Sequence, residues 1–169
     1  MQINVSQLLQ ESVGATREHD IDAEAEIIGD GNEYNIKGSC RLLRAQRSIF
    51  AKCNLDAEVE LTCNRCLGRF RHPLKIKFEE EFLPTVDIQS GADLPPPEDA
   101  GSFTIDAQHN IDLTEAIRQY ALLAVPMKVL CDEDCAGLCQ KCGHNLNQGK
   151  CDCPAGDIDP RWAKLTRLK

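Results

Sequence analysis

The sequence is poor in aromatic side chains and contains no long apolar stretch. It has one Trp, two Tyr and five Phe in 169 residues, which leaves few rings for stacking on unpaired bases. Its longest apolar run, residues 120–127, is far shorter than the ~20 residues that a membrane-spanning helix needs. The first residues do not place a basic segment before an apolar one, so no secretion signal is expected. These absences predict a cytoplasmic protein without membrane association and without sequence-specific recognition of single-stranded RNA.

Positive charge is scarce overall but is concentrated in one part of the chain. The formal net charge is −8, which disfavours indiscriminate binding to nucleic acid. Residues 41–77 nevertheless carry nine Lys or Arg against three acidic residues, a local net of +6. Residues 79–115 carry ten acidic residues and no Lys or Arg. A basic band between acidic flanks could attract a polyanion, and a solvated sheet face with mixed charges would have the same composition.

Motifs typical of enzymes are also missing. The sequence contains no nucleophile elbow, no phosphate-binding loop and no paired acid and base at catalytic spacing. We therefore expect a protein that is not an enzyme.

Cysteine, in contrast, is abundant, with ten residues in the chain. Eight of them occur in close pairs: Cys63, Cys66, Cys131, Cys135, Cys139, Cys142, Cys151 and Cys153. Tetrahedral zinc takes four sulfur ligands that are usually delivered as such pairs, and a reducing cytosol disfavours the alternative of a disulfide framework. A reactive-thiol site would need cationic neighbours, whereas Cys131 and Cys135 enclose three acidic residues. The pattern predicts two structural Zn²⁺ ions per chain, with iron as the alternative metal.

The eight cysteines can be divided between two sites in two ways. In the first partition, Cys139 and Cys142 join Cys151 and Cys153, so the upstream pair completes a site with Cys131 and Cys135. In the second, Cys63 and Cys66 join Cys139 and Cys142, as in a zinc ribbon. Gly143 favours the half-site before it, because such a turn needs a positive φ. His144 is an alternative ligand there.

Residues 34–82 carry the clearest periodicity in the sequence. Apolar residues alternate with polar ones along two runs, 53–61 and 70–82, which flank the first cysteine pair. This pattern predicts a long antiparallel β-hairpin with one buried face and a Cys-x-x-Cys tip. Gly68 is expected to ease the chain into the second strand. Cys40 and Cys53 lie within strand-like segments and are interpreted as small buried apolar residues.

The remaining segments complete an α+β fold. A short helix is expected from Ser6, and a longer one from Asp112, with Glu115 forming a capping box, up to Pro126. Residues 83–102 form an acidic, Pro-rich loop that we expect to be exposed and mobile. We expect an α+β domain over 1–130, an antiparallel sheet with one packed helix, and a cysteine-rich metal-binding module over 131–169 that ends in a basic helix from Pro160.

Three segments together resemble one known family. LTCNRCLGRF, CDEDCAGLCQKCGHNLNQGKCDC and DPRWAKLTRLK are similar to the bacterial YceD family, the large ribosomal RNA subunit accumulation proteins. The motif GLCxxCGxNLN, here Gly137 to Asn147, is the specific part of the resemblance. The resemblance implies a cytoplasmic, non-catalytic factor that supports the synthesis, processing or stability of large-subunit ribosomal RNA.

Two routes to that role remain open, besides a thiol-redox alternative. Direct contact with ribosomal RNA would use basic side chains near the first cysteine pair and in the C-terminal tail to neutralise phosphates. These residues are Arg65, Arg69, Arg71, Lys75, Lys77, Arg161, Lys164, Arg167 and Lys169. In the other route, the protein is an adaptor without RNA contact, whose acidic segment meets a basic ribosomal or processing protein.

Overall fold

The computed structural model describes residues 1–97, 99 and 101–153. The chain divides into two compact units. Unit 1 consists of Met1–Leu61 and Phe70–Val129, and unit 2 consists of Thr62–Arg69 and the chain from Leu130 onward. The first cysteine pair therefore lies in a short insertion that belongs to the same unit as the later cysteines.

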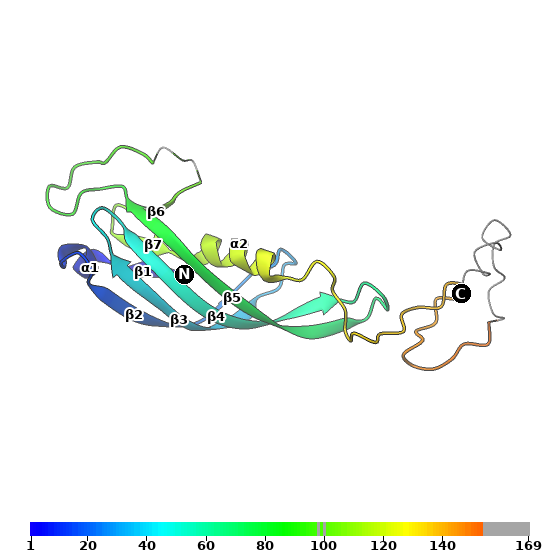
Figure 1. Ribbon diagram of the computed structural model, residues 1–169. Coiled ribbons are helices and arrows are strands. Elements are labelled where there is room, and N and C mark those ends of the chain that lie inside the picture. Colours follow the sequence, from blue (N-terminus) through cyan, green and yellow to red (C-terminus); the bar gives the residue numbers. More distant parts are fainter. Residues whose placement is uncertain (98, 100, 154–169) are drawn as a thin grey trace, which may run out of the picture. The chain divides into compact units, whose positions relative to one another are not determined.

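Unit 1 contains one sheet and two helices among the described residues (Figure 1). The helices are α1 (Ser6–Gln10) and α2 (Thr114–Ala124). The strands are β1 (Gln2–Asn4), β2 (Thr16–Ala25), β3 (Tyr34–Arg44), β4 (Ile49–Thr62), β5 (Arg69–Pro84), β6 (Phe103–Ile105) and β7 (Asn110–Asp112). Their order across the sheet is β1-β7-β6-β5-β4-β3-β2.

The sheet is mixed, so the expectation of a purely antiparallel sheet is wrong. Strand β6 pairs with β5 in parallel, with Phe82 opposite Phe103. A parallel neighbour requires a connection of about a dozen residues or more, and the Pro-rich segment between β5 and β6 provides it. Part of this segment is ordered by the chain itself, because Val86 forms a bridge with Asp93.

Strict alternation along β4 places one face of this strand in the core. Residues 49, 51, 53, 55, 57 and 59 are buried, and the intervening positions are exposed. Strands β4 and β5 are neighbours in the sheet and are joined by residues 63–68. The predicted strand runs are therefore present, and the first cysteine pair lies in the connection between them.

The two unpaired cysteines of the sequence analysis are in fact paired. Cys40 and Cys53 are direct cross-strand partners in β3 and β4, and they form a disulfide bond. Both are buried, as predicted, but the interpretation as separate apolar residues is wrong. The sequence does not reveal the register between β3 and β4, and it is this register that places the two positions opposite each other.

Helix α2 packs against the sheet through one apolar face. Ala116, Ile117 and Ala121 are buried in the same core as the sheet residues. The Tyr120 ring stacks on Phe78 of β5 with a centroid distance of 5.1 Å. The helix therefore covers one sheet face of unit 1, as Figure 1 shows.

The predicted capping box at the start of α2 is not formed, because the helix begins one residue later than expected, with Leu113 at the N-cap position and no side-chain capping hydrogen bond. The Asp112 carboxylate accepts a hydrogen bond from the Thr114 backbone N–H at 2.9 Å in a local turn before the helix. The Glu115 carboxylate instead accepts hydrogen bonds from Arg118 and Gln119 within the helix. The short helix expected at Ser6 is present as α1. The predicted helix from Pro160 lies outside the described residues.

No helix in the described part of the chain is long and apolar enough to span a membrane.

Candidate metal centre

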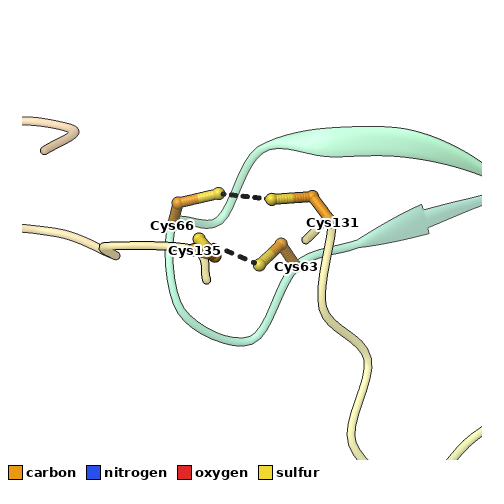
Figure 2. A group of neighbouring side chains, drawn as sticks. All are labelled: Cys63, Cys66, Cys131 and Cys135. Atoms are coloured by element: carbon orange, nitrogen blue, oxygen red, sulfur yellow. Dashed lines mark hydrogen bonds between the residues drawn. The ribbon is translucent and has the colours of Figure 1, made fainter. Parts of the chain in front are cut away.

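Unit 2 brings four cysteines from two distant segments into one group. Cys63 and Cys66 come from the β4–β5 connection, and Cys131 and Cys135 come from the chain after α2. The Sγ atoms of Cys63 and Cys135 are 3.8 Å apart, and those of Cys66 and Cys131 are 3.6 Å apart. All four sulfurs lie within 4.8 Å of one another. Figure 2 shows the four side chains converging on a common centre.

This spacing suits a four-sulfur metal site. With Zn–S bonds of about 2.3 Å, the sulfurs of a regular tetrahedron lie about 3.8 Å apart. The closest pairs in the group match that separation. Four sulfur ligands leave no open coordination position, so such a site is structural.

A tight turn presents the first two of these sulfurs. The Leu67 backbone N–H donates to the Cys63 carbonyl at 2.9 Å, and the Cys63 N–H donates to the Gly68 carbonyl at 2.9 Å. The Arg65 N–H points at the Cys63 sulfur at 3.4 Å. The positive φ of this turn, 56°, occurs at Leu67, so the prediction that Gly68 provides the conformational freedom is wrong.

Arg65 holds the two segments of this group together. Its guanidinium donates to the carbonyls of Glu133 at 3.1 Å and Cys135 at 3.0 Å. A Cβ at Gly137 would approach the Arg65 carbonyl to 3.2 Å, so the backbones also pack closely here. Sequence reasoning assigned Arg65 to RNA contact and missed this role, because no local pattern reveals a contact across about 70 residues.

The last four cysteines form a second group, Cys139, Cys142, Cys151 and Cys153, whose sulfurs also lie within 4.8 Å of one another. Gly143 has a φ of +73°, as the sequence predicts, and its N–H donates to the Cys139 carbonyl at 2.9 Å. The two groups correspond to the first partition considered from the sequence. Within the described residues, neither group includes a histidine, and His144 contributes its carbonyl to the Cys139 N–H instead.

Each group contains one thiol whose pKa is lowered and one thiol whose pKa is raised. Burial raises the pKa of Cys63, but backbone N–H donors, including that of Cys66, outweigh it and lower this pKa to about 6. The neighbouring Cys135 sulfur raises the pKa of Cys131 to about 12. A second thiolate beside the first is therefore unfavourable without a cation.

The same pattern recurs in the second group. Backbone N–H donors, first that of Cys142, lower the pKa of Cys139 to about 6. The Cys142 sulfur raises the pKa of Cys153 to about 12. A divalent metal among the sulfurs would offset this repulsion and displace the remaining protons.

Asn147 connects the two groups. Its amide nitrogen donates to the Cys135 sulfur at 3.3 Å, and its Oδ1 accepts the Ala136 N–H at 2.8 Å. The backbone between them is tied back as well, because the Leu146 N–H donates to the Gly137 carbonyl at 2.9 Å. The segment bearing Cys139 and Cys142 therefore ends in a side chain that supports the other group. Asn147 is the last residue of the motif GLCxxCGxNLN, but the sequence alone does not indicate that its side chain contacts a cysteine sulfur.

The residues predicted to contact RNA that lie in the described part of the chain differ in their surroundings. Arg71 is exposed and pairs with Glu58 on β4 at 3.1 Å. Lys75 and Lys77 are exposed on the same face of β5 and have no carboxylate partner in the described part of the chain. Arg69 is likewise exposed at the start of β5. Arg161, Lys164, Arg167 and Lys169 lie outside the described residues.

A mixed sheet joined to a unit with two four-sulfur groups defines a protein with structural metal-binding potential. The model of the family described as "Large ribosomal RNA subunit accumulation protein YceD" matches residues 51–169, which include all eight clustered cysteines. The chain belongs to the YceD family. The family description names an accumulation factor and no reaction.

Individual relatives agree with this membership. The chain is 39% identical over 59 residues to large ribosomal RNA subunit accumulation protein YCED homolog 1, chloroplastic, from Arabidopsis thaliana. The aligned stretch covers 35% of this chain and 18% of that protein. It is 32% identical over 150 residues to an uncharacterized Mycobacterium leprae protein, covering 88% of this chain and 64% of that one.

An uncharacterized Mycobacterium bovis protein is 33% identical over 106 residues, covering 63% of this chain and 48% of that one. The chain thus spans less than two thirds of the length of these relatives. No solved structure matches it.

Proposed function

We propose that this chain is a non-catalytic factor in the accumulation of large-subunit ribosomal RNA, and that two structural zinc ions hold its cysteine-rich unit together. The observation that carries the proposal is the family match over residues 51–169, the part of the chain that contains both sulfur groups. Four sulfurs at these separations suit Zn²⁺, and iron would accept the same ligands.

The role in RNA accumulation is tested in cells that lack the gene. The ratio of large-subunit to small-subunit ribosomal RNA should fall, and the full chain should restore it. A Cys63→Ser, Cys66→Ser variant should restore it poorly, because half of the first group is removed. A Lys128→Ala variant is the control, since this exposed side chain belongs to neither group. An unchanged ratio in the deleted strain would contradict the proposal.

An adaptor without RNA contact is the second candidate, and the basic side chains themselves favour it. Arg65 is occupied by two backbone carbonyls, and Arg71 is paired with Glu58. Fewer cations are therefore left for phosphates than the local net charge suggests. The acidic segment 79–115 would then meet a basic ribosomal or processing protein.

Pull-down with and without nuclease separates the two candidates. Partners that survive nuclease support the adaptor, and partners that are lost support direct RNA contact. A Lys75→Ala, Lys77→Ala variant sharpens the result: it should weaken RNA retention and flatten its salt dependence only if these side chains contact phosphates. A thiol-redox function would instead require activity of the metal-free protein in a thiol–disulfide exchange assay.

A further inference from the structure

Unit 1 contains a cleft that neither sulfur group touches. It has a volume of about 400 Å³ and lies between α1, the β3–β4 turn and the segment that follows β5. Its apolar walls are formed by Leu9, Pro84, Val86, Ile88 and Leu94. A smaller hollow of about 170 Å³ shares Arg47, Pro84 and Leu94 with it and adds Pro95 and Pro97. The two hollows therefore adjoin along an apolar, proline-rich wall.

Backbone hydrogen bonds build this wall. The Leu94 N–H donates to the Thr85 carbonyl and the Asp87 N–H to the Ala92 carbonyl, both at 2.9 Å. The Asp87 carboxylate caps the turn by accepting the Ser90 N–H at 2.7 Å. The cleft is consequently preformed, which lowers the entropic cost of binding.

Two guanidinium groups line the cleft without a carboxylate partner in the described part of the chain. Arg44 is half-buried, and its guanidinium donates to the carbonyls of Leu9 at 3.3 Å, Ala45 at 2.6 Å and Ser48 at 3.2 Å. Arg47 is exposed and makes no hydrogen bond or ion pair there. The carboxylate in the lining, Asp87, is engaged in its own turn. In a chain of net charge −8, this cleft is a local positive site with apolar walls.

We propose that this cleft binds a short extended peptide of a partner protein, in which large apolar side chains lie next to a carboxylate. The apolar side chains would enter the main hollow, and the carboxylate would receive hydrogen bonds from Arg47 and Arg44. Neither hollow has an aromatic side chain in its lining, so unpaired bases would find no stacking platform. The volume lies within the range of roughly 300–1,000 Å³ typical of ligand sites. The proposal depends neither on metal binding nor on the role in RNA accumulation.

The test uses the full metal-loaded chain, isotope-labelled for NMR. The probe is a capped tetrapeptide of the sequence Asp-Leu-Phe-Asp. It should shift the signals of Arg44, Arg47 and Leu94 and bind with a Kd below about 1 mM. Replacing its aspartates with asparagines, or its Leu-Phe pair with glycines, should weaken binding by about tenfold in each case.

Charge reversal in the protein provides the matched comparison. Arg47→Glu should weaken binding of the aspartate peptide by at least about tenfold and leave the melting temperature unchanged, because Arg47 is exposed and unpaired. Arg41→Glu, on the exposed face of β3, should leave binding unchanged. Equal binding of aspartate and asparagine peptides, no shift at the named residues, or displacement of the peptide by an oligouridylate of five nucleotides would overturn the proposal.

Discussion

The amide nitrogen of Asn147 lies 3.3 Å from the sulfur of Cys135 and donates a hydrogen bond to it. This contact lowers the pKa of the Cys135 thiol, since a donor favours the thiolate. Cys135 belongs to the first sulfur group, whereas Asn147 follows the first cysteine pair of the second. The Asn147 side chain therefore supports the first group, although it lies in the segment that carries the cysteines of the second group.

Asn147→Ala should weaken metal binding at the first group. The substitution removes the donor to the Cys135 sulfur and leaves the Ala136 N–H without its acceptor. Loss of such a supporting contact commonly costs about 10- to 100-fold in metal affinity. Competition with a chromophoric chelator measures the effect, and cobalt substitution should shift the absorption bands of one site only. Gln148→Ala is the control, and equal affinities for the two variants would refute the supporting role.

Cys151→Ser combined with Cys153→Ser should reduce the metal content from two ions per chain to one. These residues supply half of the second group and none of the first. Elemental analysis with native mass spectrometry gives the count, and alkylation of the native protein gives the location. Cys139 and Cys142 should become open to alkylation, whereas Cys131 and Cys135 should stay protected with Cys63 and Cys66. Labelling of Cys131 and Cys135 in this variant, with Cys139 and Cys142 protected, would show the zinc-ribbon partition instead.

Metal binding at pH 7 should release protons from both groups. Cys131 and Cys153 have pKa values raised to about 12, so both thiols are protonated in the metal-free protein, whereas zinc binds thiolates. Cys63 and Cys139, with pKa values lowered to about 6, are mostly thiolates at pH 7.

Calorimetry in two buffers of different ionisation enthalpy counts the released protons. Below pH 6 the zinc affinity should fall more steeply, because protons then compete with zinc for the sulfurs of Cys63 and Cys139 as well. An affinity that does not depend on pH between 5 and 7 would contradict ligation by these sulfurs.

Tyr120→Phe should destabilise unit 1 by about 1 kcal/mol, since it removes the hydrogen bond from the Tyr120 hydroxyl to Glu80. Tyr120→Ala should cost about 3 kcal/mol, because it also removes the ring stacked on Phe78. Urea denaturation of the metal-loaded protein measures both. Gln119→Ala, at an exposed position of the same helix, should change the free energy of unfolding by less than about 0.5 kcal/mol. Equal decreases in the free energy of unfolding for all three variants would show that Tyr120 does not contribute to the packing of α2.

The features that could be predicted from the sequence are those with a local signature. Alternation of apolar and polar residues identified β4 and β5 because a strand turns successive side chains to opposite faces. The 3.6-residue period identified α2 in the same way. Close cysteine spacing marked the half-sites, because two sulfurs on one turn can reach the same ion.

Tertiary structure alone decided which distant residues meet. Cys40 faces Cys53 because of the register between β3 and β4. Strand β6 joins β5 in parallel because a long connection lets the chain return beside β5 in the same direction. Arg65 meets the carbonyl of Cys135 only after the chain between them has folded. Periodicity describes neighbours along the chain, whereas these contacts join segments whose relative positions depend on the packing of the whole unit.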